Sequence, residues 1–451
     1  MLKFWHQHVA AGLPVVRLAI AIALLPFAID WRSPLLAAYR PAALSALVAV
    51  PLLLLAIDGW MLRKSQSGIR RALSVAVVLA AGAALIATLS LEARFQWVRA
   101  RVLAADPAQL EMLGRHFVVG YRDAAEIERL IERRAIGGVF VGAHNVAGLS
   151  ADAIRGQIAA WQDTRRRQGL PPLLVATDQE GGAVSRLSPP LPRQPPIASV
   201  VAPHAGGAGS NAAAHDYGLA QGRALAGAGI NLNFAPVVDL NKNLVNPNDR
   251  YTRIRDRAIS GDPAIVTEVA RYYCRGLWEA GVHCTLKHFP GLGGVFEDTH
   301  LEAGHLRASL EELESSDWIP FRALMGRPDE KPMGSTFTML SHARLTALDA
   351  ERPVSFSPAI ISGLLRERWG HDGVLITDDF SMGAVYASRE GIAAASVAAL
   401  DAGVDLILIS YDPGQYFTMM DAVLSAARDR RLHHDVLVRS ARRLAGAGVG
   451  R

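Results

Sequence analysis

The sequence predicts an α/β protein, a (β/α)8 barrel that is preceded by an N-terminal region of transmembrane helices. Two observations support this prediction. From about residue 105, short β-rich runs alternate with amphipathic helical stretches, whereas long apolar segments dominate the chain before that point. We therefore expect a membrane-anchoring region in residues 1–100 and a separate barrel domain in residues 101–451.

The barrel is predicted from eight short runs that are rich in β-forming residues. They cover residues 117–121, 138–142, 173–177, 232–238, 283–289, 337–342, 373–379 and 405–410. Helix-like stretches lie between them, for example residues 124–134, 264–281 and 359–370. Eight strand–helix units are typical of a TIM-type barrel. An open doubly wound sheet is the alternative, but no Gly-x-Gly-x-x-Gly motif follows the first strand.

The membrane region is predicted from three apolar segments in the first hundred residues. They are Leu13–Ile29, Ala42–Ile57 and Ala72–Leu91. The third carries no charge over a length that can cross the hydrocarbon core, whereas the first is interrupted by Arg17. Buried core helices are the alternative. A cleaved signal peptide is disfavoured, because the apolar segments repeat and no small-residue cleavage site follows the first.

The loop between the second and third segments predicts the orientation in the membrane. Its basic residues are Arg63, Lys64, Arg70 and Arg71. Because such loops prefer the cytoplasm, three crossings would place everything after about residue 92 outside. We therefore expect a multi-pass protein of the inner (cytoplasmic) membrane with a periplasmic barrel. The basic residues Arg94, Arg99 and Arg101 on the outer flank argue against this orientation.

The charge, the spacing of possible metal ligands and the two cysteines limit the partners and cofactors that are expected. The formal net charge is +5 and the basic residues are scattered, so we do not expect nucleic-acid binding. No ligand cluster has a spacing suited to a metal, and no metal or organic cofactor is expected. The two cysteines, Cys274 and Cys284, are expected to be buried free thiols, with a single disulfide as the alternative.

Polar residues close or directly follow five of the eight predicted strands. They are Asp178, Asp239, Lys287, His288, His342, Asp378 and Asp379. Active sites of barrel enzymes lie at the carboxyl ends of the strands, where these residues would meet. Charged groups in apolar surroundings are costly unless they are paired, so this arrangement predicts a functional site. Taken singly, Asp379 and Asp239 are expected to fix the backbone, and His342 suits either a barrel contact or a substrate contact.

Six ordered motifs resemble the single-barrel β-N-acetylglucosaminidases of glycoside hydrolase family 3, which act in peptidoglycan turnover. The motifs are ATDQEGGAVSRL (176–187), NFAPVVDL (233–240), RIRDRAISGDP (253–263), KHFPGLGGVFEDTH (287–300), SHARLTALD (341–349) and GVLITDDFSMGAV (373–385). The resemblance implies Asp378 as nucleophile, with Asp298 and His300 as an acid/base dyad. It also implies a group of sugar-binding residues: Asp178, Arg186, Arg257, Lys287 and His288.

These residue types suit a retaining glycosidase on chemical grounds. Such an enzyme needs a carboxylate on one face of the sugar and a proton donor on the other. A histidine can be the donor, since it titrates near neutral pH and a neighbouring carboxylate can orient its ring. We therefore expect hydrolysis of terminal β-linked N-acetylglucosamine from cell-wall glycans or muropeptides, which would be the carbohydrate partner of this chain.

Two departures from the family pattern and two rival functions remain open. The turn at 291–294 reads Gly-Leu-Gly-Gly where the family commonly has Gly-His-Gly-Asp, so Leu292 and Gly294 replace a histidine and an acid. Ala183 stands where an arginine usually follows Glu-Gly-Gly. A buried Leu292 would pack the loop on the barrel, whereas an exposed one would meet the aglycone. Phosphorolysis or transglycosylation is one rival function, and a catalytically weak glycan-binding barrel is the other.

Overall fold

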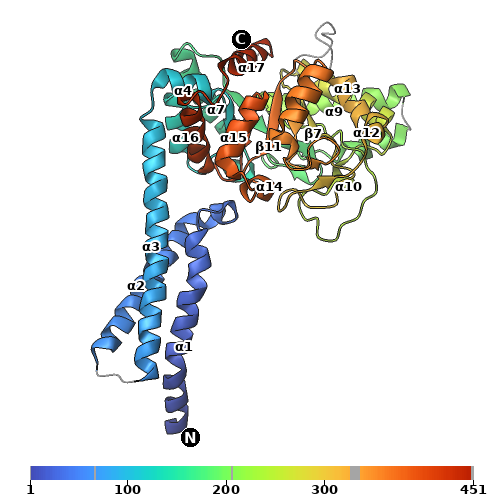
Figure 1. Ribbon diagram of the computed structural model, residues 1–451. Coiled ribbons are helices and arrows are strands. Elements are labelled where there is room, and N and C mark those ends of the chain that lie inside the picture. Colours follow the sequence, from blue (N-terminus) through green and yellow to red (C-terminus); the bar gives the residue numbers. More distant parts are fainter. Residues whose placement is uncertain (1, 65–67, 205–206, 326–335, 448–451) are drawn as a thin grey trace. The chain divides into compact units, whose positions relative to one another are not determined.

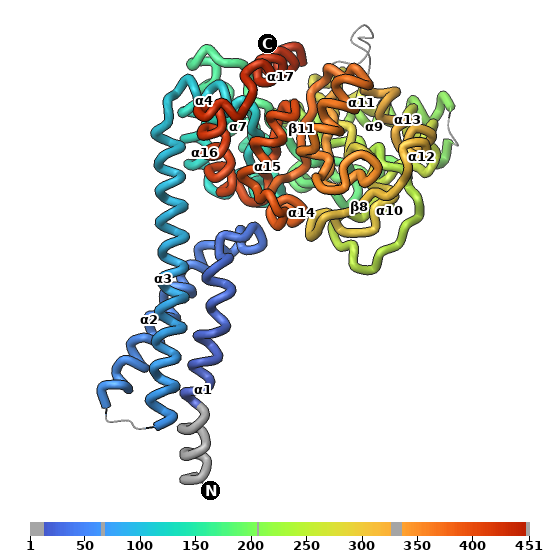
Figure 2. Tube along the Cα trace, viewed as in Figure 1, coloured from blue at the N-terminus to red at the C-terminus, as the bar shows by residue number. Residues whose placement is uncertain are grey.

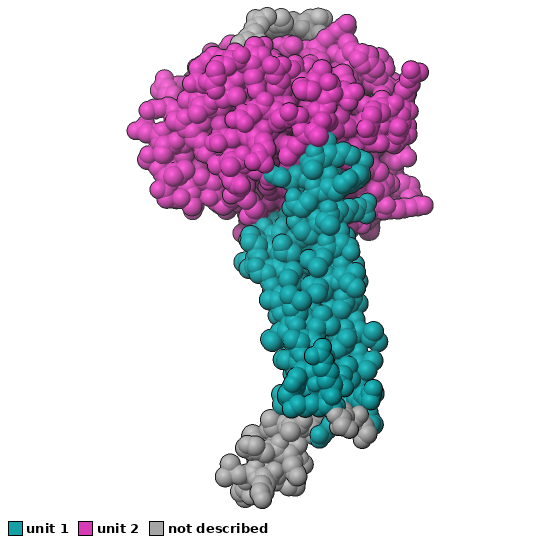
Figure 3. All heavy atoms as spheres, turned by 90° about the vertical axis from the view of Figure 1, so that its left-hand side faces the viewer, with its two compact units in different colours: residues 1–101 teal, residues 102–451 magenta. Residues whose placement is uncertain are grey.

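The computed structural model describes residues 2–64, 68–204, 207–325 and 336–447, with side chains from residue 13 onward. Two compact units are present, Met1–Arg101 and Val102–Arg451, which are teal and magenta in Figure 3.

The second unit is built on one sheet of eight parallel strands that forms an almost closed barrel (Figure 1). The strands are β1 (Phe117–Val119), β2 (Gly138–Phe140), β3 (Leu174–Thr177), β6 (Leu232–Asn233), β7 (Thr285–Phe289), β9 (Phe337–Leu340), β11 (Leu375–Asp379) and β12 (Leu406–Ile409). They pair in chain order, and β12 pairs with β1. Isolated parallel bridges, Leu232 to His283 and Val237 to Lys287, join the two remaining edges. The α/β class and the parallel eight-stranded barrel are therefore confirmed.

Helices and two short ladders lie before, between and after the strands of the barrel. The helices are α4 (Pro107–Gly114), α5 (Ala124–Glu132), α6 (Ala143–Val146), α7 (Ala151–Arg167), α8 (Ile197–Val201), α9 (Gly207–Gly227), α10 (Ile254–Arg257), α11 (Pro263–Glu279), α12 (Leu310–Glu314), α13 (Trp318–Leu324), the π-helix η4 (Ala359–Arg368), α14 (Gly383–Tyr386), α15 (Gly391–Ala402), α16 (Gln415–Arg428) and α17 (His434–Gly446). The ladders are antiparallel β4 (Gln179–Gly181) with β5 (Val184–Ser185), and parallel β8 (His305–Leu306) with β10 (Arg344–Leu345).

Local sequence explains where the helix α11 begins. Asp262 precedes α11 and its side chain accepts hydrogen bonds from the backbone N–H groups of Ala264 and Ile265. Pro263 then occupies the first helical position, where a backbone donor is not needed. The three helices that the sequence predicted correspond to α5, α11 and η4, so their existence is confirmed with boundaries shifted by a few residues.

The apolar core follows the period-2 pattern of the strands. Val118, Phe140 and Phe234 belong to one buried cluster, in which the two phenylalanine rings stack with centroids 5.8 Å apart. The other members are Leu174, Ala176, Leu232, Phe337, Met339, Val374, Ile376, Leu406, Leu408, Leu444 and Ala447. Alternate residues of neighbouring strands thus fill the barrel, and polar side chains are left for its ends.

A buried ion network ties α17 to the amino ends of the strands. Asp405 precedes β12, is fully buried, and accepts from Arg366 Nη2 at 2.7 Å and Arg443 Nε at 2.9 Å. Ser440 Oγ of α17 donates to the same carboxylate at 2.6 Å. The catalytic groups of such barrels lie at the opposite end. This ion network therefore contributes to the stability of the fold rather than to the site.

The expectation of two free thiols is wrong, because Cys274 and Cys284 form a disulfide. Cys274 lies in α11 and Cys284 directly precedes β7. The short connection turns the chain back, so that the two Cα atoms lie 5.5 Å apart, within the range that a disulfide spans.

The first unit contains three long helices that pack against one another (Figure 2). They are α1 (Leu2–Ile29), α2 (Arg40–Arg63) and α3 (Ile69–Leu103), with a 3₁₀ turn η1 (Pro34–Tyr39) before α2. Ala21, Leu54 and Val77, one residue from each helix, meet in a buried cluster. Two segments, Pro34–Arg63 and Ile69–Leu103, are long and apolar enough to cross a membrane, which is weak evidence for a membrane region.

A paired arginine explains how the first apolar segment tolerates a charge. Arg17 of α1 donates to Asp58 of α2 through Nε at 2.8 Å and through Nη2 at 3.0 Å. Asp58 is fully buried. Both charges are therefore compensated inside the helix bundle, which an isolated buried charge would not be.

Candidate active site

An almost fully buried lysine lies at the centre of the polar cluster at the carboxyl ends of the strands. Lys287 of β7 is 2% exposed, and its Nζ lies 2.6 Å from Asp178 Oδ1 and 2.6 Å from Glu180 Oε1. Asp178 follows β3, and Glu180 belongs to β4. The lysine can remain charged there because two carboxylates neutralise it.

Arg257 of α10 completes this cluster by a two-pronged contact with Glu180. Its Nε lies 2.9 Å from Glu180 Oε2, and its Nη2 lies 2.5 Å from Oε1. Burial acts to raise the pKa of Glu180, but the charges of Arg257 and Lys287 hold that pKa well below its ordinary range. Glu180 was missed in the sequence, although it stands two residues after Asp178 in the first quoted motif.

Asp239 orients His288 and the beginning of the following loop. Its Oδ2 lies 2.7 Å from His288 Nδ1, and both its oxygens accept from the His288 backbone N–H at 3.1 Å. The Leu292 backbone N–H donates to Oδ1 at 2.7 Å. The other ring nitrogen of His288, Nε2, lies 3.4 Å from Arg257 Nη2. Asp239 thus fixes loop and ring, as expected for that residue.

The Gly-Leu-Gly-Gly turn packs on the barrel. Leu292 is 2% exposed, so the buried alternative for this residue is confirmed. A Cβ atom on Gly293 would lie 2.0 Å from the carbonyl oxygen of Leu240, and only glycine permits this approach. Leu292, one of the departures from the family pattern, is therefore a packing residue at the base of the loop.

The predicted dyad residues Asp298 and His300 lie together on this loop. Asp298 is 3% exposed, and its Oδ1 lies 3.3 Å from His300 Nδ1. The His300 side chain remains 38% exposed. Burial acts to raise the pKa of Asp298, but hydrogen bonds from His300 and Thr252 lower it well below its ordinary range. Asp298 is therefore ionised at neutral pH and can orient the His300 ring.

A backbone contact joins the dyad loop to the strand end that carries Asp378. The His300 carbonyl accepts from the Gly383 N–H at 2.8 Å, and Gly383 begins α14, directly after β11. A Cβ atom on Gly383 would lie 2.2 Å from the Leu301 carbonyl oxygen, so glycine is required at this contact.

Asp378 lies half-buried near the end of β11. Its Oδ1 accepts from the Asp379 backbone N–H at 2.8 Å. Burial acts to raise the pKa of Asp378, but the electrostatic influence of the nearby His288, His342 and His300 lowers it overall. The carboxylate is therefore ionised at neutral pH.

The neighbouring residues Asp379 and His342 are engaged within the barrel. Asp379 accepts from the backbone N–H groups of Ser381, Ser410 and Tyr411 at 2.8–3.1 Å. His342 is fully buried, with Nδ1 2.7 Å from Ser355 Oγ and Nε2 3.0 Å from the Asp379 carbonyl oxygen. These contacts favour backbone fixation for Asp379 and the barrel role for His342.

Arg186, unlike the other predicted sugar-binding residues, lies outside the buried charge cluster. It follows β5, it is exposed, and its backbone N–H donates to the Asp178 carbonyl at 3.2 Å. Its exposed side chain therefore lies outside the buried cluster.

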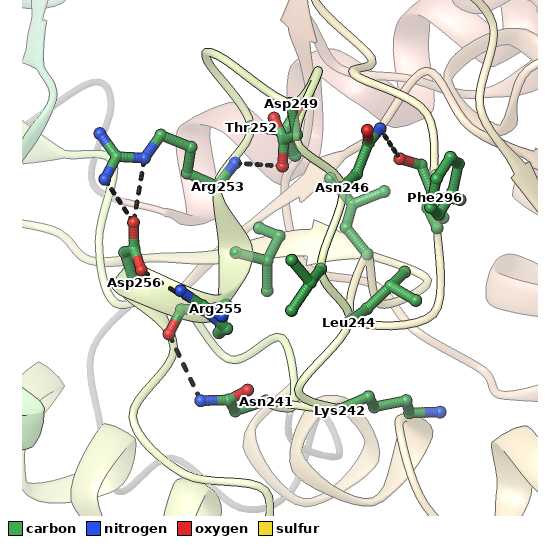
Figure 4. Close-up of a pocket in the computed structure, with 15 residues that line it drawn as sticks. Asn241, Lys242, Leu244, Asn246, Asp249, Thr252, Arg253, Arg255, Asp256 and Phe296 are labelled. Atoms are coloured by element: carbon green, nitrogen blue, oxygen red, sulfur yellow. Dashed lines mark hydrogen bonds and ion pairs between the residues drawn. The ribbon is translucent and has the colours of Figure 1, made fainter.

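A cavity of about 230 Å³ lies between the segment that follows β6 and the loop that follows β7 (Figure 4). Leu244, Ile254, Leu292 and Val295 supply apolar lining, and Thr252 lines it as well. Asn246 Nδ2 donates to the Phe296 carbonyl at 2.6 Å and thus connects the two walls. Within the described residues, no group of three or more His, Cys, Asp or Glu side chains could hold a metal ion.

Comparison with known proteins identifies the family. The family model described as "Glycosyl hydrolase family 3 N terminal domain" matches residues 102–446. The chain belongs to glycosyl hydrolase family 3. A beta-hexosaminidase of Methylococcus capsulatus is 34% identical to this family 3 chain over 306 residues, which are 68% of this chain and 85% of the relative. A beta-hexosaminidase of Xylella fastidiosa is 32% identical over 326 residues, with 71% and 88% covered.

Solved structures of family 3 proteins share the fold. A β-N-acetylglucosaminidase from Paenibacillus sp. FPU-7 superposes with a TM-score of 0.66 and 28% identity, covering 75% of this chain and 61% of that longer one. A β-N-acetylhexosaminidase from Beutenbergia cavernae gives a TM-score of 0.65 and 29% identity, covering 75% and 98%. The recognised resemblance is therefore confirmed, and the chain is a glycoside hydrolase.

The charge cluster predicts that Glu180→Gln destabilises the barrel. Lys287 and Arg257 lose a shared buried carboxylate, so the free energy of unfolding should fall by about 3–5 kcal/mol. Urea unfolding of the detergent-solubilised chain, followed by tryptophan fluorescence, measures this loss. Because the folded pKa of Glu180 is depressed, its contribution is present above the unfolded pKa of about 4.3 and is lost as the pH falls below it. The difference from wild type should therefore narrow in acid.

A matched control is Glu268→Gln, which removes an exposed carboxylate 3.3 Å from Arg271. Its effect should stay below about 1 kcal/mol. Equal effects of the two substitutions would contradict the role of Glu180 as a buried counter-ion.

Proposed function

We propose that this glycoside hydrolase removes terminal β-linked N-acetylglucosamine with retention of configuration. The observation that carries the proposal is the hydrogen bond between the His300 carbonyl and Gly383 N–H, which joins the dyad loop to the strand end of Asp378. The names of the curated relatives support a hexosamine as the sugar, and the solved Paenibacillus relative is a β-N-acetylglucosaminidase.

The charged cluster beside Asp378 suits the recognition of a sugar. Lys287, Arg257 and His288 would donate hydrogen bonds to hydroxyl oxygens and to the N-acetyl carbonyl, and Asp178 would accept from hydroxyl groups. Their mutual contacts hold these groups in place before the sugar arrives, so little ordering is needed on binding. Arg186, at the surface of the hairpin, would reach the sugar from outside the cluster.

In the first step Asp378 attacks the anomeric carbon, and a covalent glycosyl ester forms as the bond to the leaving oxygen breaks. His300 Nε2–H gives its proton to that oxygen. Asp298 stays ionised and stabilises the protonated ring through Nδ1. A general acid placed in this way contributes about 10²–10⁴-fold to the rate.

In the second step neutral His300 takes a proton from water, and the resulting hydroxide equivalent attacks the anomeric carbon. The ester bond to Asp378 breaks, which returns the carboxylate and releases the sugar. Two displacements at one carbon retain its configuration. The enzyme ends with His300 protonated again, so the cycle is balanced.

The cell-wall substrate and the location in the inner membrane belong to the same proposal. The apolar helices α2 and α3 would span the membrane, and the basic residues between them would stay in the cytoplasm. The Cys274–Cys284 disulfide supports a periplasmic barrel, because disulfides persist in oxidising compartments. Muropeptides and similar wall fragments would be available there.

Replacing Asp378 by alanine should lower turnover of an aryl β-N-acetylglucosaminide by about 10⁴-fold or more, because the nucleophile is lost. Added azide should restore release of the phenol and yield an α-glycosyl azide, since azide enters the vacated space below the anomeric carbon. Absorbance of the released phenol and the product's anomeric coupling constant in NMR measure both effects.

The control Asp152→Ala changes an exposed carboxylate of α7 and should leave turnover unchanged. Undiminished activity in the Asp378 variant would overturn the proposed nucleophile. The same assay with inorganic phosphate separates phosphorolysis from hydrolysis: free N-acetylglucosamine is expected, and N-acetylglucosamine 1-phosphate would support the rival chemistry.

The membrane topology predicts the behaviour of reporters fused after residue 451. Alkaline phosphatase, which needs an oxidising compartment, should be active, and green fluorescent protein exported unfolded should be dark. A bright fluorescent fusion with an inactive phosphatase fusion would place the barrel in the cytoplasm instead.

A further inference from the structure

A short segment between β6 and α10 holds the carboxylate of the dyad. The backbone N–H groups of Arg250 and Tyr251 both donate to Asp298 Oδ2 at 3.0 Å. The next residue, Thr252, donates from its hydroxyl to Asp298 Oδ1 at 2.9 Å. Three consecutive residues thus surround an anion that lies 46–48 positions further along the chain.

Thr252 contacts every member of the dyad segment 298–300. Its hydroxyl oxygen accepts from the Thr299 backbone N–H at 3.2 Å and lies 3.3 Å from His300 Nδ1. The threonine is 4% exposed, so water does not compete freely for these contacts. The hydroxyl therefore restrains both the carboxylate and the ring that the carboxylate orients.

The backbone of the same residue is connected to the sugar-binding cluster. The Thr252 carbonyl accepts from Arg257 Nη1 at 2.7 Å, and the other nitrogens of that guanidinium bind Glu180. Thr252 therefore lies between the charged residues that would bind the sugar and the dyad that would transfer the proton.

From these contacts we propose that Thr252 is a positioning residue for proton transfer. Its hydroxyl fixes the direction in which His300 Nε2 points. Its carbonyl fixes the position of the dyad relative to Arg257. This inference rests on the proposed function, in which His300 is the acid. Thr252 itself touches neither sugar nor reacting atoms in this role.

The chemistry of the hydroxyl distinguishes positioning from packing. Valine fills nearly the same volume but can neither donate to Asp298 nor accept from Thr299. Serine keeps both hydrogen bonds and loses only a methyl group. A pure packing role would therefore favour valine over serine, whereas the positioning role favours serine.

The test compares two aryl β-N-acetylglucosaminides with the full chain in detergent. One carries a 2,4-dinitrophenyl group, which departs without protonation, and the other an unactivated phenyl group, which needs the acid. Thr252→Val should lose about 10- to 100-fold in kcat/KM on the phenyl substrate, part of what a positioned acid supplies, because kcat/KM reports the first displacement alone. On the activated substrate the loss should be small, and Thr252→Ser should resemble wild type on both.

Thr267→Val is the matched control, because Thr267 is also buried but its hydroxyl donates to the Pro263 carbonyl within α11. It should show no leaving-group dependence. If Thr252→Val does not fold, Thr252→Ala replaces it, since alanine removes the hydroxyl without adding a methyl group.

His300→Ala, assayed in parallel, separates the two proposals. A leaving-group-dependent loss in His300→Ala with a uniform loss, or none, in Thr252→Val overturns the positioning role and leaves the proposed acid intact. Equal losses of His300→Ala on both substrates overturn His300 as the acid, and the role of Thr252 with it. The same pattern in both variants, weaker in Thr252→Val, supports the inference.

Discussion

The site depends on the neutralisation of Lys287 by Asp178 and Glu180. An ammonium group that is 2% exposed would be very costly without these two carboxylates. Glu180 in turn binds Arg257, so one carboxylate holds two cations on different parts of the barrel. The positions of β3, β4, β7 and α10 relative to one another are thereby coupled at the carboxyl ends of the strands.

Beside this cluster, two carboxylates each hold one histidine ring, and the two rings differ in their exposure to solvent. Asp239 and Asp298 accept several backbone hydrogen bonds and orient His288 and His300. Each carboxylate acts through a ring that it holds. Of the two rings, only His300 has a side chain that is more than one-third exposed, so it is the one suited to meet a departing group.

Strand positions and the placement of Asp378 at a strand end could be predicted from the sequence because both follow local patterns. Each of the eight apolar runs forms a barrel strand, and Asp378 lies near the end of its strand. The contacts of Glu180 could not be predicted in this way. Its partners Arg257 and Lys287 are 77 and 107 residues away, and the closing of the barrel brings them together.

The other features that could not be predicted from the sequence have similar physical causes. Thr252 lies in an irregular segment with no periodic pattern, so its hydroxyl contacts depend on how that segment meets the 292–300 loop. The disulfide depends on the reversal of the chain between α11 and β7, which residue types alone do not show. Leu292 could be placed only once Asp239 was seen to hold its backbone.

The central claim is that Asp378 forms a covalent bond to a sugar that is bound by the charged cluster. A 5-fluoro N-acetylglucosaminyl fluoride tests this most directly, because the fluorine slows release of the glycosyl enzyme. Mass spectrometry of peptides from the trapped protein should find the sugar on Asp378. A label on another residue, or turnover of the reagent with no covalent adduct, would contradict the account.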